Sequence, residues 1–339
     1  MAFALRALTC TLIAAALLTS ASMARVTPSD GARPAYRGEL WRMSGRLVAR
    51  DGRAFSYAAS FFRYAQPHGT VLCPASISIL DESSGHVFQE RRVERAGLGL
   101  ADVAIGTLSL RVGGWRLREP RANGASHAFD LDARLAGVSL RIHGVARKPR
   151  FTLPSSKNVV DEYSSIANTG TVALGGTSVA VTGKSWFDHE LSNGTPDGNQ
   201  PHAQYRVQLD DGREIFVETW GSAGTRSSRR RAYLVERNGS IDVLRPDAYE
   251  FGANPGVGWR STHTGIIYPD IWALHVDNKT EFLSLEPVTY DQESLAHSSG
   301  LPYWDGGVDV YDVTPGSQGL RLGSGYVLMT GYAPEEKRP

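Results

Sequence analysis

Short segments in which hydrophobic and polar residues alternate recur along the chain, and no long stretch follows a helical period. Residues 46–50 and 54–57 alternate around Asp51-Gly52, and residues 205–209 and 215–217 alternate around a second Asp-Gly pair. A period of two places successive side chains on opposite faces of a strand. Asp-Gly supplies the positive φ that a tight hairpin turn requires. The pattern therefore predicts an all-β chain built from antiparallel hairpins.

Two further hairpins and a weak internal repeat indicate how the strands are grouped. Hairpins are also expected around Asn238-Gly239 and Asn278-Lys279, and Gly52 and Gly212 of the first two turns lie 160 residues apart. Evenly spaced short strands are typical of barrels and sandwiches, and closing a sheet into a barrel removes its exposed edges. We therefore predict two β-barrels in tandem.

The boundary between the two units is placed in a stretch with several turn residues. Residues 147–168 contain Lys148-Pro149 and a Pro-Ser-Ser run, which indicate a linker. We accordingly predict an N-terminal barrel over residues 35–165 and a C-terminal barrel over residues 166–334, the second carrying a Trp-Phe-Asp-His-Glu motif.

The N-terminus has the features of a secretory signal peptide. Arg6 precedes an apolar run, and the small residues Ser22 and Ala24 stand at positions −3 and −1 of a cleavage site. We expect cleavage near Ala24 and export to the periplasm or the medium. Elsewhere no apolar run approaches the ~20 residues of a membrane span, so no transmembrane segment is expected in the mature chain.

Charge and cysteine content narrow the class of protein further. The 339 residues include 36 Lys and Arg against 35 Asp and Glu, and removal of residues 1–24 takes away Arg6 and leaves 35 of each. A neutral chain has no global field to attract nucleic acid, so we expect no nucleic-acid partner. Cys73 is then the remaining cysteine, and it is expected to be a small buried hydrophobe.

One segment combines a strand pattern with ionisable residues. Residues 179–190 begin as a strand and end in Trp186-Phe187-Asp188-His189-Glu190. In an extended chain Trp186, Asp188 and Glu190 share one face. Two carboxylates beside an indole disfavour each other's ionisation, and a carboxylic acid that keeps its proton near neutral pH suits general-acid catalysis.

Roles for these residues follow from that face. Asp188 would be the acid, Glu190 would tune it, and His189 would act as a proton shuttle or orienting partner. The structural alternative is that Asp188 caps a turn and His189 bonds a backbone carbonyl. The nine histidines never fall at metal-ligand spacing, and no phosphate or dinucleotide motif is complete, so we expect no metal and no cofactor.

Aromatic residues supply a candidate ligand-binding surface. The residues concerned are Trp41, Trp186, Tyr268, Trp272 and Trp304. Large rings often fill barrel interiors, and the alternative is that they line an apolar ligand cavity with a few placed polar groups.

Several motifs together resemble the AttH/CrtC family of lipocalin-like proteins, which includes the carotenoid 1,2-hydratases. The matching stretches are residues 38–41, 60–63, 181–190, 208–214, 268–272, 303–307 and 325–332. The resemblance extends from Glu39 to Tyr332 and implies two lipocalin-like barrels in tandem, with residues 186–190 near their interface. The chain resembles the exported AttH-type branch more than the hydratases, because Leu191 stands where the hydratases have a tryptophan.

Three functions remain open at this stage. The first is an enzyme that hydrates, isomerises or cyclises an apolar unsaturated molecule, such as a polyene or isoprenoid, with acid assistance. The second is a non-catalytic carrier of a lipid or other hydrophobic ligand, and the resemblance implies association with an ABC transporter. The third is glycoside chemistry, for which paired carboxylates would have to face each other across an open cleft.

Overall fold

The computed structural model describes residues 29–120, 127–154, 158–193, 200–221, 229–254, 258–295 and 302–334. The predicted signal peptide lies outside these ranges. Within them the chain forms strands and turns. None of the described residues belongs to a helix that is long and apolar enough to cross a membrane.

The larger of two main sheets has twelve strands, which run antiparallel to their neighbours in the order β4-β3-β2-β1-β12-β11-β9-β8-β7-β6-β5, with β10 paired to β11. Its strands are β1 (Gly38–Ala49), β2 (Ala54–Ala65), β3 (Val71–Asp81), β4 (His86–Arg95), β5 (Ala101–Val103), β6 (Ser109–Val112), β7 (Trp115–Arg118), β8 (Ala128–Leu135), β9 (Val138–Ala146), β10 (Phe151–Pro154), β11 (Asn158–Leu174) and β12 (Thr177–Ser192).

The second sheet has ten strands in the order β16-β15-β14-β13-β24-β23-β21-β20-β17, with β22 paired to β23. Its strands are β13 (His202–Leu209), β14 (Glu214–Trp220), β15 (Arg229–Val235), β16 (Ile241–Leu244), β17 (Tyr249–Ala253), β20 (Trp272–Val276), β21 (Leu283–Pro287), β22 (Glu293–Ser294), β23 (Tyr303–Asp312) and β24 (Arg321–Thr330). β18 (Trp259–Arg260) and β19 (Ile267–Tyr268) form a separate two-stranded sheet.

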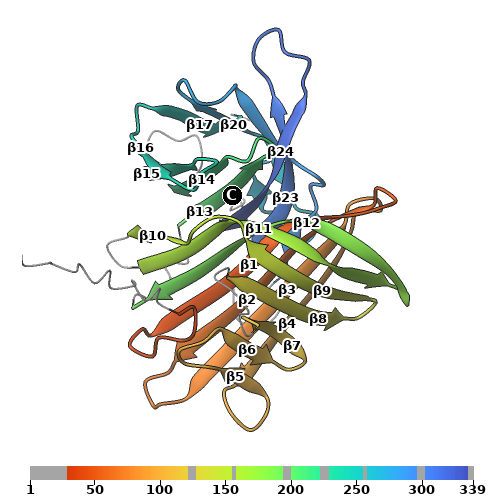
Figure 1. Cartoon of the computed structure of the whole chain (residues 1–339), viewed down its shortest axis with the longest axis vertical. Coiled ribbons are helices and arrows are strands. Elements are labelled where there is room, and N and C mark those ends of the chain that lie inside the picture. Colours follow the sequence, from red (N-terminus) through yellow and green to blue (C-terminus); the bar gives the residue numbers. More distant parts are fainter. Residues whose placement is uncertain are drawn as a thin grey trace, which may run out of the picture.

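Each main sheet curls into a nearly closed barrel, and the two barrels are stacked along the long axis of the molecule (Figure 1). The all-β tandem-barrel prediction is thus confirmed. The four predicted hairpins are present as β1–β2, β13–β14, β15–β16 and β20–β21. Gly52 and Gly212 both have φ of 87° at the first two turns, as the Asp-Gly pattern required.

The predicted boundary at residues 165/166 does not match the sheets. β11 and β12 both belong to the first sheet, so the motif at residues 186–190 lies in the first barrel and not in the second. The stretch predicted as a linker holds β10 and much of β11. β12 pairs with β1 from Gly38↔Ser192 to Ala49↔Val181. Without β12, β1 would expose a long unpaired edge, which explains why the chain completes this barrel before it crosses over.

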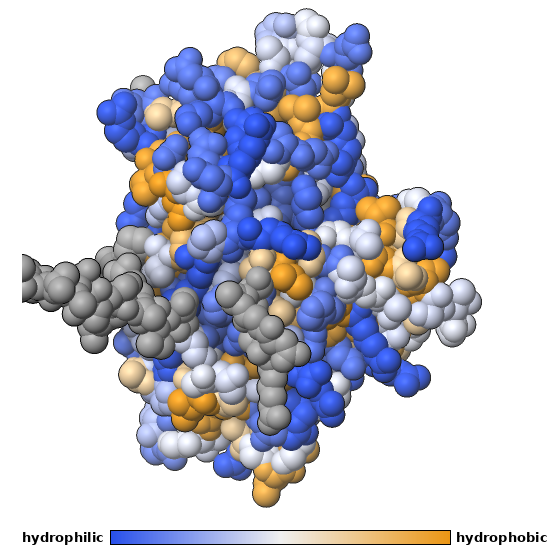
Figure 2. All heavy atoms as spheres, in the orientation of Figure 1, coloured by the Kyte–Doolittle hydropathy of each residue, from blue (hydrophilic) through white to orange (hydrophobic). Residues whose placement is uncertain are grey.

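Hydrophobic side chains fill the two barrels separately. Trp41, Leu47 and Phe187 belong to the core of the first barrel, while Tyr205 and Trp272 belong to the core of the second. Cys73 is fully buried in the first core, as predicted. Outside, hydrophilic side chains cover most of the visible face, and hydrophobic residues are scattered among them (Figure 2). Such scatter is ordinary for a protein surface.

The barrels approach each other closely where β23 passes β2. A Cβ atom added at Gly307 would lie 2.9 Å from the Ser56 Cβ and closer still to its hydroxyl oxygen. The Gln292 side chain fixes the same backbone, since Gly307 N donates to Gln292 Oε1 at 2.9 Å and Gln292 Nε2 donates to Gly307 O at 3.1 Å. Glycine at this position therefore allows the barrels to touch.

Gly307→Ala should destabilise the protein by about 1–3 kcal/mol, because the added methyl group overpacks the contact between the barrels. Gly252→Ala on β17 is the matched control, since a Cβ there meets nothing within 4 Å. Urea denaturation of both variants measures the difference. Equal free energies of unfolding would contradict the close approach.

Candidate functional site

The barrels meet through their outer faces, and that contact is rich in polar residues. On β1 the side chains of Trp41 and Met43 point into the first barrel, so Arg42 and Ser44 between them face outward. On β13, Tyr205 points into the second barrel, and Arg206 faces the first. Arg42, Ser44 and Arg206 are nonetheless buried. The alternation of each strand thus places polar side chains in a buried layer between the barrels.

Cross-strand pairing aligns three ionisable residues in this layer. Arg42 on β1 lies opposite Asp188 on β12, and Asp188 lies opposite Glu162 on β11. Directly opposite residues have Cβ atoms only ~5 Å apart. The register of the first sheet therefore brings one guanidinium and two carboxyl groups to the same point of the inter-barrel contact.

The second barrel supplies the partners of these charges. Arg206 binds Asp188 with two nitrogens, Nε to Oδ1 at 3.1 Å and Nη2 to Oδ2 at 2.5 Å. Arg42 binds Asp305 of β23 through Nη2, and its guanidinium lies 5.5 Å from the centroid of the Tyr326 ring. Two arginines and two aspartates thus form two ion pairs, and each pair joins one residue of the first barrel to one residue of the second.

Glu162 stands beside these pairs, and none of the described residues forms an ion pair with it. It is fully buried, and its Oε2 accepts a hydrogen bond from Trp186 Nε1 at 2.8 Å. Its Oε1 has no hydrogen-bond partner among the described residues. Burial, with the nearby Asp188 charge, raises the pKa of Glu162 well above its ordinary value, against the lowering effect of Arg206. An ionised Glu162 would be an uncompensated buried charge, so the carboxyl group holds its proton.

The pKa of Asp188 is also raised, but less strongly than that of Glu162. Burial raises its pKa to about 6, Arg206 and Arg42 act in the opposite sense, and Glu190 adds to the rise. The site therefore contains two neighbouring carboxyl groups of different acidity, which is the arrangement that acid–base catalysis uses.

A small cavity lies beside Trp186 and Arg206, the residues that bind the carboxyl groups of Glu162 and Asp188. It lies between β1 and β12 of one barrel and β13 and β24 of the other, and its walls include Ser44, Arg46, Trp186, Arg206, Gln208 and Tyr326. The space open to the centre of a water molecule is about 10 Å³, roughly that needed for one water. A larger molecule enters only if the barrels move apart.

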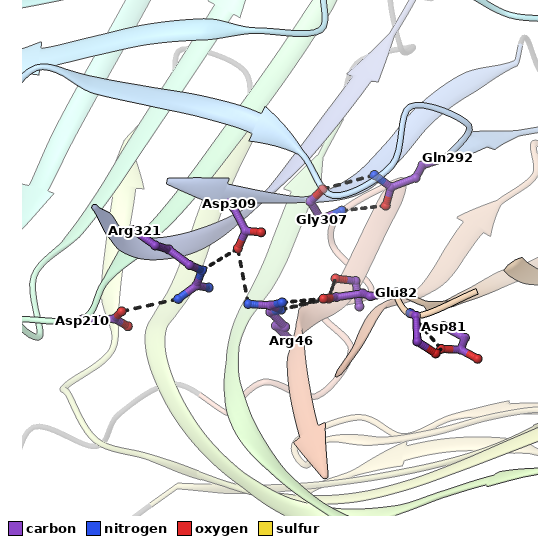
Figure 3. A network of polar contacts seen from close by, with 10 residues as sticks. Arg46, Asp81, Glu82, Asp210, Gln292, Gly307, Asp309 and Arg321 are labelled. Atoms are coloured by element: carbon purple, nitrogen blue, oxygen red, sulfur yellow. Dashed lines mark hydrogen bonds and ion pairs between the residues drawn. The ribbon is translucent and has the colours of Figure 1, made fainter. Parts of the chain in front are cut away.

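A network of charged residues connects the two barrels through Arg46, which also lines the cavity (Figure 3). Arg46 is held by Glu82 of its own barrel, with Nε at 2.9 Å from Oε1, and reaches Asp309 of the second barrel with Nη1 at 3.3 Å. Arg321 holds the same Asp309 at 2.7 Å. Because Arg46 is partly exposed, this crossing is weaker than the buried pairs.

The structure places the predicted catalytic residues on different sides of β12. Asp188 belongs to the inter-barrel layer, and Glu190 lies at its edge, where Oε1 accepts from Gln204 Nε2 at 3.2 Å. His189 points into the first barrel, where it stacks on Trp41 at 4.7 Å and lies 3.2 Å from Glu39. As predicted, Trp186 and Phe187 point to opposite faces of β12. This alternation keeps His189 away from the carboxyl groups of Asp188 and Glu190.

The predicted aromatic residues also separate. Of the five, Trp186 lines the inter-barrel cavity. Trp41 is in the core of the first barrel, and Tyr268, Trp272 and Trp304 are in the core of the second. The core interpretation therefore describes four of the five positions.

Three buried residues could in principle hold a metal ion. Ligand atoms of Asp30, Asp161 and His189 lie within 4.8 Å of one another. Arg33, however, binds Asp161 at 2.7 Å, and Arg150 contacts both aspartates at 3.3 and 3.6 Å. These guanidinium groups already neutralise the carboxylates, so the donor set fits an ion-pair network rather than a cation site.

The sequence did not identify Glu162, Arg206, Arg42 or Asp305 as site residues. Glu162 lay in the stretch taken for a linker, and Arg206 was one polar position in a predicted hairpin. The alternation of that hairpin already placed Arg206 on the outer face of its barrel. Which outer faces meet depends on the docking of the barrels, for which the sequence carries no local signal.

Comparison with known proteins agrees with the fold. A model of a family described as AttH-like matches residues 20–332. A candidate AttH from Nitrosomonas europaea superposes with a TM-score of 0.76 at 22% identity, covering 89% of this chain and 95% of that chain. Kievitone hydratase from Nectria haematococca has a TM-score of 0.68 at 16% identity, covering 93% and 95%. CghA with Sch210972 has 0.55 at 15% identity, covering 87% and 88%. No curated protein matches the sequence.

Asp188→Asn should destabilise the protein by about 3–5 kcal/mol, because Arg206 would remain as a buried and uncompensated charge. Glu190→Gln serves as the control, since that half-buried side chain is linked to the neutral Gln204. Guanidinium chloride denaturation compares the two. A loss no larger for Asp188→Asn than for Glu190→Gln would show that the Arg206 pair does not hold the barrels.

The raised pKa of Glu162 makes stability depend on pH with a definite sign. A group with a raised folded-state pKa stabilises fully below its ordinary value, here 4.5, and loses that contribution as the pH rises through the folded-state pKa. Glu162→Gln is neutral at every pH and keeps an oxygen for the Trp186 indole. The free energy of unfolding is measured in urea from about pH 5 to 8. As the pH rises, that of Glu162→Gln should fall less steeply than that of the wild type. Parallel curves would mean that Glu162 is ionised in the folded protein.

Proposed function

Because the chain belongs to the AttH-like family, we propose that it is a lipocalin-like enzyme that protonates a carbon–carbon double bond of a small apolar molecule between its two barrels. The observation that carries this proposal is the buried Glu162 carboxyl group. Burial raises its pKa well above the ordinary value, and its Oε1 has no hydrogen-bond partner among the described residues. Its Oε2 binds the Trp186 indole, which lines the cavity together with Tyr326.

The proposed chemistry needs one proton donor and one proton acceptor. Glu162 transfers its proton to one carbon of the double bond, and the electron pair of that bond forms the new C–H bond. The cation left on the other carbon is stabilised by the faces of Trp186 and Tyr326. Water then adds to the cation and returns a proton to the Glu162 carboxylate, so that the net change is addition of H₂O. Loss of a neighbouring proton, or attack by a second double bond, gives isomerisation or cyclisation instead.

This proposal assigns the role of general acid to Glu162 and not to Asp188. The sequence assigned the role to Asp188, but its bidentate pair with Arg206 favours the ionised form. Asp188 and Arg206 thus act as positioning residues that keep a charge-balanced layer around the neutral Glu162. One structural neighbour is named a hydratase, and another was solved with the small molecule Sch210972. Their sequence identities of 16% and 15% support the shared fold, on which this chemistry is proposed.

The glycoside alternative loses its support. It required two carboxyl groups facing each other across an open cleft. Glu162 and Asp188 are 0% and 1% exposed and lie side by side on neighbouring strands of one sheet, which leaves no room for a sugar ring between them.

Export through residues 1–24 and association with an ABC transporter remain parts of the proposal, resting on the signal-peptide pattern and on the resemblance. Export and association with a transporter would equally suit the alternative function, a non-catalytic carrier. Mass spectrometry of the exported protein tests that alternative, because a carrier would release an apolar ligand unchanged.

Glu162→Gln should lower kcat/KM by about 10²–10⁴-fold, the usual contribution of a general acid, while the variant stays folded. The measurement follows the gain of one water mass in a panel of apolar alkenes incubated with the wild type and the variant. Glu250→Gln, exposed on β17, is the control. Equal turnover by Glu162→Gln and the wild type would exclude Glu162 as the proton donor.

A further inference from the structure

We propose that the first barrel docks on a lipid membrane through the turns on either side of β5, with Leu98 inserted among the lipids and exposed arginines of the neighbouring strands on anionic headgroups. The inference goes beyond the proposed function and does not depend on it. It is carried by a group of exposed hydrophobic residues, by the backbone that presents them, and by the charge of the strands around them.

Exposed hydrophobic residues gather around the short edge strand β5. Leu98 is 98% exposed, and Ile105 is 70% exposed. β5 lies at the end of the molecule farthest from the second barrel, where hydrophobic residues reach the surface (Figure 1, Figure 2). Among the described residues, ten large hydrophobic side chains are exposed, and four of the ten fall within residues 93–105, namely Val93, Leu98, Leu100 and Ile105. This group therefore departs from the scatter seen elsewhere on the surface, and it lies away from the inter-barrel site.

The backbone holds Leu98 outward in a conformation that is unfavourable for leucine. Gly97, Leu98 and Gly99 have φ of 95°, 52° and 75°, and a left-handed conformation is uncommon for a residue with a large side chain. Hydrogen bonds nevertheless fix the turn, because Leu100 N donates to Gly97 O at 3.1 Å and Arg111 Nη1 donates to Gly99 O at 2.5 Å. A leucine that is strained, held in place and exposed gains nothing from folding, so its position indicates a binding role.

Arginines exceed acidic residues in the strands around these turns. β4, β5, β6 and β7 contain six arginines against three acidic residues, and the turns between them contain no charged residue. This segment thus carries a net charge of +3, whereas the whole chain carries +1. Arg91, Arg95 and Arg116 are exposed, and no acidic group of the described chain forms an ion pair with them. Their charge is therefore available to the phosphate of a lipid headgroup.

A membrane fits this surface better than a protein partner does. A specific protein interface takes about 20–30 residues on each side and needs matching shapes, whereas the apolar residues here stand on short turns beside charged strands. A fluid bilayer accepts an exposed leucine without a preformed pocket, and anionic lipids attract basic segments that lie near the membrane surface. Apolar insertion and headgroup contact strengthen each other, as stable docking at a membrane requires.

The test measures binding of the exported protein to large unilamellar vesicles by sedimentation. Vesicles of phosphatidylcholine with phosphatidylglycerol are compared with vesicles of phosphatidylcholine alone. We expect the wild type to bind the anionic vesicles more tightly by about tenfold or more, because of the unpaired arginines. Leu98→Asn should weaken this binding about tenfold, since it removes the side chain that enters the lipids. Asparagine tolerates the left-handed conformation, so the variant should fold like the wild type.

Leu320→Asn is the matched control. Leu320 is also an exposed leucine, at 59%, but it lies between β23 and β24 of the second barrel, so its replacement should leave vesicle binding unchanged. The double variant Arg91→Gln, Arg95→Gln should weaken binding to the anionic vesicles and leave binding to phosphatidylcholine unchanged.

Two results would overturn the inference directly. These are failure of the wild type to bind anionic vesicles and equal binding by Leu98→Asn and the wild type. A wild-type dimer that ignores vesicles and that Leu98→Asn converts to a monomer would assign the turn to a second copy of this chain, and would overturn the inference as well. Turnover of alkenes is not measured in this test, so its failure would leave the proposed function standing.

Discussion

The burial of charge between two barrels is the constraint on which the rest of this structure depends. Arg206 and Asp188, like Arg42 and Asp305, form pairs with one member in each barrel. A buried charge is tolerated only when a partner and further hydrogen bonds replace its water. Each barrel alone would leave its half of these pairs unmatched. The two barrels therefore have one favourable docking, and the position of β13, β23 and β24 against β1, β11 and β12 follows from it.

The same constraint sets the chemical state of Glu162. The two arginines are balanced by two aspartates, so no positive charge remains to support an ionised third carboxyl group in the layer. The indole N–H of Trp186 satisfies one oxygen of Glu162, and the other oxygen has no hydrogen-bond partner in the part of the chain that the structure describes. A neutral carboxylic acid is thus a consequence of the charge balance, and its neighbours Arg206 and Asp188 matter to the chemistry because they maintain that balance.

The inter-barrel contact also divides into a firm part and a weaker part. Trp186, Phe216 and Tyr233 form a third hydrophobic cluster between the barrels, and Lys148 is buried against Glu214 nearby. At the cavity rim the crossing is the partly exposed pair of Arg46 and Asp309. A contact that is hydrophobic on one side and ionic on the other opens more readily on the ionic side, because water can replace an exposed ion pair at little cost.

The sequence by itself determined the strands, the hairpins and the face of each side chain. Asp51-Gly52 fixed a turn through local backbone geometry, and the period of two set Trp186, Asp188 and Glu190 against Phe187 and His189. The tertiary structure decided what local pattern cannot encode. Glu162 became the neighbour of Asp188 through the register of β11 on β12. Arg206 became the ion-pair partner of Asp188 through the docking of the barrels. Turns and alternation depend on adjacent residues, whereas pKa values and ion pairs depend on groups that only folding brings together.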